Sequence, residues 1–408
     1  MPELIPHLFR TEYRKIVAVL CKRFGFRQIE IAEDIASDTF LVASQTWGIE
    51  GAPKNPTAWL YNVAKNKAIN HLQRNALFEN KISPQLKDSQ DKVYEDDIDL
   101  SPLHINDSQL QMMFAVCHPS IPTEAQVGLS LRILCGFGIE EIADAFLSNK
   151  ETINKRLFRA KEKLREEQIA IELPGSQQIE ERLQPVLTTI YLLFNEGYYS
   201  ATPNTPLKKD LCLEAIRLCT MLVENKLTNT PQVNALIALM CFHISRFDAR
   251  INDNNELVLY DDQDETLWNS DWISKGGYFL HCAASGDQIS TYHLEAGIAY
   301  WHTQKNDNAE KWENILQLYN RLLQIEYSPI AALNRTYALS KARGKNIAIV
   351  EAEKLQLTNN FFYYLLLGEL YVNVDDDLSK QHFATATSLA KNATNKQAVQ
   401  NKMIRYYQ

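Results

Sequence analysis

The sequence predicts an all-α protein. Apolar residues recur three and four positions apart along most of the chain, which is the spacing of one helix face. Only 14 Gly and 14 Pro punctuate the 408 residues, so few turns are expected between the helices. A chain of this length favours two or three domains over one. We therefore expect a series of helical domains.

The composition is typical of a soluble globular protein, with 45% hydrophobic and 23% charged residues. No apolar run has the length of a membrane-spanning helix, and the start lacks the basic-then-apolar layout of a signal peptide. We therefore expect a cytoplasmic protein without membrane contacts. The net charge of −8 argues against a simple nucleic-acid coat protein, but the charge is uneven and two basic stretches lie in the N-terminal part.

The seven cysteines include no C-x-x-C pair, and most stand among apolar neighbours. Scattered spacing and an odd count are typical of reduced thiols packed in a core. His243, His281, His293 and His302 are separate along the chain and are expected to be structural. No phosphate-binding loop, metal-ligand spacing or catalytic motif is present, so we expect no metal, no cofactor and no enzymatic activity.

Two amphipathic helices are expected first, over Phe9–Phe24 and Gln28–Trp47. The first directs apolar residues inward and basic residues, including Arg14 and Lys15, outward. The second has an apolar side that contains Ile31, Ile35, Phe40 and Ala43. Its exposed side is acidic and contains Glu30, Glu33, Asp34 and Asp38. An acidic helix face is usually only solvated, but it can also dock a basic partner.

A loop over Gly48–Pro56 leads to a third helix, Thr57–Arg74, in which aromatic residues alternate with Lys, Arg and Asn and acids are absent. Such a surface suits single-stranded nucleic acid, because bases stack on aromatic rings while cations follow the phosphates. The alternative is that Trp59 and Tyr61 pack in the core and the lysines only aid solubility.

Periodicity is lost after this helix. Residues 78–107 contain two prolines and an acidic run that ends at Asp99, which predicts a linker. Two apolar helices are expected next, over Ser108–Cys117 and Thr123–Cys135. Thr123 and Gln126 are expected to form a capping box at the start of the second of these helices.

The segment Ile139–Arg165 predicts two helices joined by a tight turn. Ser148 and Glu151 are expected to form a capping box at the start of the second helix. Seven Lys or Arg and two Glu stand between Asn149 and Arg165, a local net charge of +5. Six polar residues are expected on the outer faces: Lys150, Asn154, Lys155, Arg159, Lys161 and Arg165. This is the pattern of a helix-turn-helix that enters the major groove of DNA, although a solvated helix pair shares these features.

The chain beyond Leu173–Ser176 is helical in pattern. Ten short helices are expected, over Ile179–Phe194, Lys208–Glu224, Pro231–Ser245, Tyr278–Ala284, Ser290–His302, Trp312–Glu326, Pro329–Lys341, Ile347–Leu355, Phe361–Tyr371 and Lys380–Lys391. Short helices with short connections suggest helical-hairpin repeats. Four residues match the first half of a tetratricopeptide unit: Tyr364, Leu367, Gly368 and Tyr371.

One segment of this part, Tyr260–Trp272, carries five acids beside two tryptophans. Three interpretations remain open. The segment is a helix start with acids at its positive end, or a contact surface built around exposed tryptophans, or a metal site. The last is the least favoured, because the spacing lacks the glycine and the terminal Glu of a calcium loop.

The order of these elements resembles the bacterial RNA polymerase sigma factors of the extracytoplasmic-function group. AEDIASDTFLVA (Ala32–Ala43) is similar to their clamp-binding helix, and PTAWLYNVAKNKAINHLQR (Pro56–Arg74) to the helix that contacts the −10 element. EEIADAFLSNKETINKRLFRAKEKLR (Glu140–Arg165) resembles region 4, which reads the −35 element. FNEGYYS, DLCLEAIRL and YDDQDETLW resemble the tetratricopeptide-like extension of one subgroup. Ser37 stands where the family often has Gln, and Asn70 where it often has Asp.

The resemblance implies a protein that binds core RNA polymerase and promoter DNA. Asp34, Asp38 and Phe40 would contact the polymerase, and the loop Trp47–Pro56 would hold a base flipped from the −10 strand. The rest of that strand would contact Trp59, Asn62, Lys65, Asn66, Lys67 and Arg74. The −35 duplex would contact Lys150, Glu151, Asn154, Lys155 and Arg159. The acidic linker would extend toward the RNA path of the polymerase.

The expected organisation has four parts. They are region 2 over 1–77, the acidic linker over 78–107, region 4 over 108–172 and a helical-repeat extension over 177–408. The extension would regulate or assist the promoter recognition by the first three parts. The alternative is a helix-turn-helix regulator of another class with a helical-repeat sensor or protein-interaction domain. Such a regulator would not need the aromatic and basic helix, which favours the sigma-factor interpretation.

Overall fold

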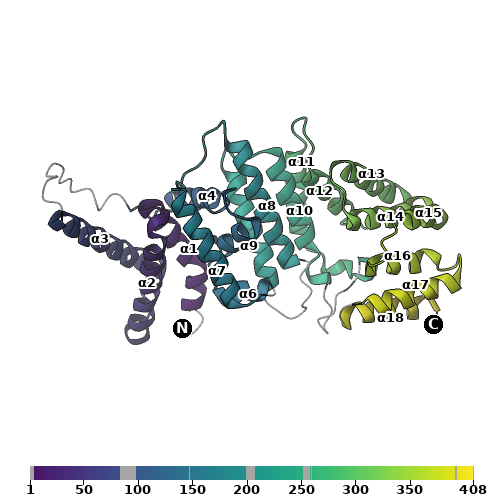
Figure 1. The fold of residues 1–408 in the computed structure, drawn as a ribbon, viewed down its shortest axis with the longest axis horizontal. Coiled ribbons are helices and arrows are strands. Elements are labelled where there is room, and N and C mark those ends of the chain that lie inside the picture. The colour runs from purple at the N-terminus through teal and green to yellow at the C-terminus, as the bar shows by residue number, and fades with distance from the viewer. Residues whose placement is uncertain are drawn as a thin grey trace. The chain divides into compact units, whose positions relative to one another are not determined.

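The computed structural model describes residues 4–82, 98–146, 148–198, 207–250, 258, 260–390 and 393–407. Every regular element within these ranges is a helix, which confirms the expected all-α fold (Figure 1). Among the described helices, none is long and apolar enough to cross a membrane. The chain forms two compact units: the first holds α1 to α8 with most of α9, and the second holds α10 to α18.

The first unit begins with three long helices that carry the expected acidic and aromatic–basic faces. They are α1 (Leu4–Phe24), α2 (Ile29–Glu50) and α3 (Pro56–Ile82), with the short 3-10 helix η1 (Phe26–Gln28) after α1. Gly25 ends α1 with φ at +76°, a conformation that a side chain would strain. Because α3 continues to Ile82, the predicted linker starts inside a helix, and its central residues 83–97 lie outside the described residues.

Helix α1 lies at the centre of this unit, where it packs against α2, α3, α4 and the π-helical segment η2. Its apolar side chains, such as Tyr13, Ile16 and Leu20, are buried. The prediction that Arg14 faces solvent is wrong, since its side chain is only 8% exposed. The reason is that α9 (Leu207–Glu224) reaches this side of α1 and places the carboxylate of Glu214 2.5 Å from the Arg14 guanidinium.

The next elements form the helix-turn-helix part. They are α4 (Pro102–Val116), α5 (Thr123–Leu129), η2 (Ser130–Leu134), α6 (Ile139–Ala145) and α7 (Lys150–Glu166). The predicted capping box at the start of α5 is wrong. Gln126 instead donates from Nε2 to the carbonyls of His118, at 3.1 Å, and Ile121, at 2.9 Å, so it stabilises the turn before the helix. The buried Nε2 group is thereby satisfied by backbone carbonyls, and Thr123 takes no part.

Helices α8 (Ile179–Tyr198) and α9 belong to the first unit, although they follow the expected boundary at 172–177. Side-chain contacts tie them to the earlier helices. Arg182 donates to the Phe114 carbonyl at 3.0 Å, and Arg217 donates to the Leu134 carbonyl at 2.8 Å. Their burial against α4 and η2 is a tertiary property that the amphipathic pattern of the two helices does not reveal.

The second unit is a succession of nine described α-helices, with three short 3-10 helices between α10 and α11. They are α10 (Pro231–Ser245), α11 (Ser270–Ala283), α12 (Thr291–Trp301), α13 (Ala309–Ile325), α14 (Pro329–Arg343), α15 (Lys345–Leu355), α16 (Phe361–Tyr371), α17 (Asp376–Leu389) and α18 (Ala393–Tyr407). Each of the ten helices expected after residue 176 has a counterpart, and α10 and α16 have the expected bounds. Helix α18 is not among the expected helices, although Val399, Met403 and Tyr407 stand four residues apart and pack in one apolar cluster with Phe383.

Consecutive helices of the second unit pack on one another, from α12 on α13 through to α17 on α18 (Figure 1). Helices α16 and α17 approach closely at Gly368, where a Cβ atom would lie 2.7 Å from the Phe383 ring. Packing between sequential neighbours is typical of helical-repeat proteins.

The cysteines are free thiols, and all of them except Cys282 are buried. Burial raises the pKa of the Cys117 thiol to about 11 and that of the Cys135 thiol to about 12. Thiols of this kind are unreactive and serve as small packing groups, as the sequence predicted.

Candidate nucleic-acid interface

Helix α7 has two different sides. Four apolar residues are buried on one side: Ile153, Leu157, Ala160 and Leu164. This stripe accounts for the packing of α7 on α5 and α6. The other side presents the five residues expected at the −35 duplex, all of them exposed: Lys150, Glu151, Asn154, Lys155 and Arg159. The fold therefore keeps these polar side chains available to a partner.

The start of α7 differs from the prediction by one residue. The N-cap is Asn149, whose Oδ1 accepts a hydrogen bond from the Thr152 amide at 2.8 Å, so the predicted capping box of Ser148 with Glu151 is wrong. Asn and Ser are both good N-caps, and spacing alone does not choose between neighbours. Lys150 pairs with Glu140 of α6, which ties the two helices of the motif together.

One further residue on this side of α7 was not predicted from the sequence. Phe158 is 62% exposed, a high value for a large ring on a charged helix. It lies one helical turn from Asn154 and next to Arg159. An apolar side chain on a major-groove helix can contact the methyl group of thymine. The available signal was that Phe158 falls outside the buried stripe at 153, 157, 160 and 164.

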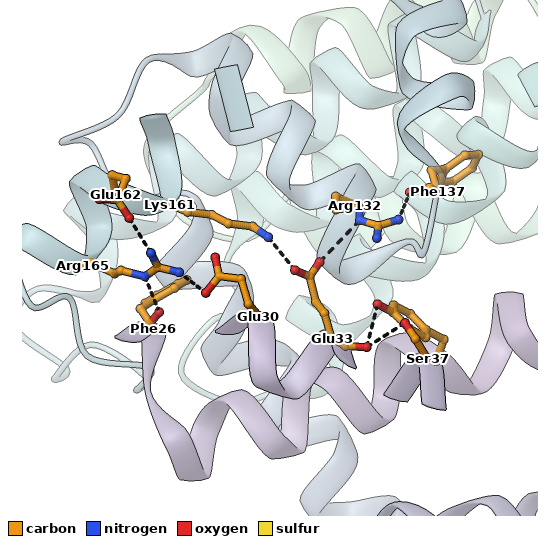
Figure 2. A network of polar contacts seen from close by, with 10 residues as sticks. Phe26, Glu30, Glu33, Ser37, Arg132, Phe137, Lys161, Glu162 and Arg165 are labelled. Atoms are coloured by element: carbon orange, nitrogen blue, oxygen red, sulfur yellow. Dashed lines mark hydrogen bonds and ion pairs between the residues drawn. The ribbon is translucent and has the colours of Figure 1, made fainter. Parts of the chain in front are cut away.

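Two basic residues of α7 do not face solvent as predicted. Figure 2 shows Lys161 pointing at the acidic side of α2, where its Nζ lies 2.6 Å from a carboxylate oxygen of Glu33. Arg132 of η2 approaches the other oxygen of the same carboxylate, with Nε at 3.4 Å. All three side chains are largely buried, with Glu33 and Lys161 each 13% exposed. The position of α2 thus decides what Lys161 contacts.

Arg165 extends the same network by one turn. Its guanidinium pairs with Glu30 of α2 and Glu162 of α7, and its Nε donates to the Phe26 carbonyl at 3.2 Å (Figure 2). Helix α7 therefore uses its inner cations to hold α2 and η1, and its outer cations remain on the exposed side.

The residues of α3 expected at the −10 strand lie along one helix. Asn62, Asn66 and Arg74 are exposed, and Trp59, Lys65 and Lys67 are half-buried. The Trp59 ring meets Trp47 edge to face, with centroids 5.2 Å apart, so part of it is used in packing. The Nζ atom of Lys67 lies 3.5 Å from a carboxylate oxygen of Asp38 on α2. The exposed asparagines and the cations thus give this side of α3 a polar surface without acids of its own.

Tyr61 takes the packing role rather than the stacking role. Its hydroxyl donates to the buried carboxylate of Glu12 on α1, which also pairs with Lys15 at 3.0 Å. Burial, followed by the hydrogen bond to Glu12, raises the Tyr61 pKa far above its ordinary value. Tyr61 is therefore part of the α1–α3 contact.

A surface groove of about 430 Å³ runs beside these residues. It is lined by Ala58, Tyr61, Asn62 and Lys65 of α3 and by the segment Ile98–Ser101, which ends the predicted linker. The pKa of Asp99 is lowered, chiefly because the Ser101 amide donates to its carboxylate at 2.8 Å. An ionised acid from the linker therefore lies near the basic side of α3.

The expected polymerase-facing residues divide into two groups. Asp34 and Asp38 are exposed on α2. Phe40 is only 4% exposed, because its ring packs against Phe9, with centroids 5.1 Å apart, and near Tyr13. Phe40 is therefore a core residue of the α1–α2 pair, which corrects its assignment to the polymerase contact.

The acidic segment at 260–272 is explained by local structure. Asp264 caps the short helix η5 (Glu265–Leu267) by accepting from the Thr266 amide, and Asn269 caps α11. Trp268 is only 8% exposed and is a packing residue, whereas Trp272 is half-buried and lies under the ammonium group of Lys275. No group of three His, Cys, Asp or Glu that could hold a metal ion is found among the described residues.

Comparison with known proteins bears on the N-terminal helices. Residues 8–77 match the sigma-70 region 2 family, a range that covers α2 and most of α1 and α3. These helices are therefore similar to the region 2 domain of sigma-70 factors. Residues 182–284 match a second family, described as a family of unknown function (DUF6596), which begins within α8 and ends after α11.

A protein of Rhizobium meliloti (strain 1021), described as uncharacterized protein R00370, is similar along most of the chain. The two are 32% identical over 375 residues, which cover 90% of this chain and 88% of that protein. The chain belongs to the same family as this relative. No solved structure matches it.

Proposed function

We propose that the chain is a sigma factor of the extracytoplasmic-function group, which binds core RNA polymerase in the cytoplasm and directs it to promoters. The observation that carries the proposal is the sigma-70 region 2 domain at residues 8–77. The protein contributes recognition only, and the polymerase contributes the chemistry. The exposed acids Asp34 and Asp38 on α2 supply the surface for the polymerase clamp.

The −10 strand lies on α3. Asn62 and Asn66 offer hydrogen bonds to bases or sugar, and Lys65 and Arg74 supply charge for the phosphates. The groove between α3 and Ile98–Ser101 lies next to this path, and the strand displaces the linker acid Asp99 from the neighbourhood of Lys65. This arrangement suits melted DNA, whose bases are accessible.

The −35 duplex takes α7 in its major groove. The exposed side of α7 supports this role, with Lys155 and Arg159 available to phosphates and Glu151 and Asn154 near the start of the helix, where base edges are contacted. The buried stripe on the other side holds α7 against α5, so the reading side is rigid.

The second unit is a tetratricopeptide-like array that regulates or assists initiation through protein contacts. The sequential packing of α12 to α18 and the close approach at Gly368 support this assignment. Arrays of this kind present extended surfaces to other proteins.

The test is transcription from purified components. Full-length protein added to core polymerase should start run-off transcription at a promoter that core polymerase alone ignores. The double substitution Lys155→Ala with Arg159→Ala should abolish initiation at that promoter while core binding persists. Absence of core-polymerase binding by the wild-type protein would refute the proposal.

A further inference from the structure

The two parts of the first unit that read different promoter elements are joined by a shared carboxylate. Glu33 of the region 2 domain contacts Lys161 of α7 at 2.6 Å and Arg132 of η2 at 3.4 Å. The carboxylate is 13% exposed, so this pairing is less screened by water than a surface ion pair. Arg165 adds a contact to Glu30. Five charged groups thus hold α7 and η2 against α2.

Helix α9 makes a second connection. The Glu214 carboxylate lies 2.5 Å from Arg14 of α1 and 2.7 Å from Arg217, and Arg217 donates onward to the Leu134 carbonyl at 2.8 Å. One carboxylate of α9 therefore links α1, in the region 2 domain, to η2, in the helix-turn-helix part. Arg10 adds a contact to Asp210 at 3.5 Å.

Helix α8 forms hydrogen bonds to the helix-turn-helix part. Arg182 donates to the Phe114 carbonyl of α4 at 3.0 Å, and Thr189 donates to the Gln126 side chain of α5 at 3.2 Å. Cys212 of α9 approaches the Phe194 carbonyl of α8 at 3.6 Å, which connects the two helices. Helices α8 and α9 together therefore reach both DNA-reading parts.

In the closed arrangement, α3 and α7 lie closer together than the −10 and −35 elements of a promoter do. Elements centred about 25 base pairs apart are separated by roughly 85 Å of straight B-form DNA. Helix α7 is about 25 Å long, since each residue adds about 1.5 Å, and Lys161 near its end touches α2. The middles of α3 and α7 therefore lie well within the promoter distance. The ion pairs must open before both elements are bound.

We propose that α8 and α9, at the start of the region that matches the family of unknown function, are an intramolecular brace. The brace and the α2–α7 ion pairs add to the packing of α1 on α4 and η2, and together they hold the free protein closed, with Glu30 occupied one helical turn from the polymerase-facing Asp34. Core polymerase competes for this face of α2 and binds the open form. The proposal that opening permits polymerase binding rests on the proposed function, whereas the existence of the brace does not.

The distance between α2 and α5 reports opening without any transcription assay. Spin labels are placed on the full-length protein at Ser44→Cys and Glu124→Cys, two exposed positions outside the contacts above. Cys282→Ser first removes the native thiol that is not buried. Double electron–electron resonance then gives the distance distribution.

The opening variant is Lys161→Glu, which places a negative charge opposite Glu33. Its matched control is Lys163→Glu, the same charge change two residues away, where the wild-type lysine pairs with Glu167, the residue that follows α7. Lys161→Ala is the milder variant if Lys161→Glu does not fold. Glu214→Gln tests the brace separately, because it removes the charge that faces Arg14.

Lys161→Glu and Glu214→Gln should each shift the distance distribution to longer values, and Lys163→Glu should not. Core polymerase, without DNA, should bind Lys161→Glu about fivefold to thirtyfold more tightly than the wild type. Unchanged distances in Glu214→Gln would overturn the brace, and unchanged distances in Lys161→Glu would overturn the role of the α2–α7 ion pairs. Longer distances with unchanged polymerase affinity would overturn its gating role. If no form binds polymerase, the proposed function fails, and the distances still decide whether the brace exists.

Discussion

Lys161 of α7 and Glu33 of α2 are 128 residues apart in the chain, and their side chains form an ion pair at 2.6 Å. Helical spacing predicts that Lys161 is polar and off the apolar stripe, which is correct. It does not predict that a second helix covers that position. The cations of α7 are consequently divided, with Lys161 and Arg165 used inside the protein and Lys155 and Arg159 left exposed.

Removal of the Glu214 carboxylate should destabilise the first unit. Glu214→Ala leaves Arg14, whose side chain is 8% exposed, without its ion-pair partner, and an unpaired buried charge costs roughly 3 kcal/mol. Calorimetry should show a lower midpoint for one transition, and hydrogen exchange should assign the loss to α1 and α9.

The matched control is Glu313→Ala in the second unit. Glu313 pairs with Arg343 at 2.6 Å, but both side chains are at least 40% exposed. An exposed pair of this kind contributes little to stability, because water and salt screen it. An equal decrease in the free energy of unfolding for the two variants would contradict the proposal that Glu214 stabilises a buried charge.

The same carboxylate predicts a pH dependence. Burial by itself raises the pKa of Glu214, but Arg217 and Arg14 outweigh it and hold the pKa below its ordinary value of 4.5. A carboxyl of this kind stabilises the folded state above its unfolded pKa, and the stabilisation is lost as the pH falls through the folded pKa. The thermal midpoint of the wild-type first unit should therefore fall below about pH 4.5 more steeply than that of Glu214→Gln. Parallel curves would refute this assignment.

Substitutions on the exposed side of α7 should separate charge from sequence readout. Lys155→Ala should weaken duplex promoter binding at every sequence and lower the salt dependence by about one counterion, as expected for one phosphate contact. Asn154→Ala should instead relax the preference for one base pair. Salt titrations on matched and mutated −35 sequences distinguish the two, with exposed Lys226→Ala on the first unit as control. A base-specific loss for Lys155→Ala would reverse these assignments.

An added negative charge on α3 should oppose the −10 strand. Asn62→Asp keeps the size of an exposed side chain, so folding is preserved, and it should weaken binding to single-stranded −10 DNA by about tenfold. Fluorescence anisotropy of the holoenzyme with labelled DNA measures the change. Asn314→Asp in the second unit is the control. Unchanged affinity for Asn62→Asp would place the strand elsewhere.

A methyl group at Gly368 should disturb the helical array. Its Cβ would lie 2.7 Å from the Phe383 ring, so Gly368→Ala should destabilise the second unit by about 1–3 kcal/mol. Gly48→Ala is the control, because a Cβ there meets no atom within 4 Å and alanine favours the helix. Circular dichroism melts compare the two. A neutral Gly368→Ala would show that α16 and α17 can separate slightly at no cost.

Several features were predictable from local chemistry. The exposure of Lys155 and Asn154 follows from periodicity, because α7 has to bury one apolar stripe whatever its partner is. The bounds of α10 and α16 follow instead from unbroken apolar runs, since both helices are buried on most sides, and the burial of the cysteines follows from their apolar neighbours. The corrections at Ser148 and Thr123 arose where neighbouring residues could cap equally well or where a side chain found a nearer carbonyl. Those choices depend on turn geometry that sequence spacing does not contain.

The sequence by itself determined the helical architecture, the basic side of α7, the aromatic and basic side of α3 and the resemblance that the sigma-70 region 2 match supports. Only the tertiary structure decided that Arg14 is buried, that Phe40 is core, and that α8 and α9 join the first unit. The physical reason is that periodicity is a local property of one helix, whereas these tertiary contacts join residues that are far apart in the chain. Periodicity reports which side of a helix is covered, whereas contacts such as Lys161 with Glu33 depend on which distant helix does the covering.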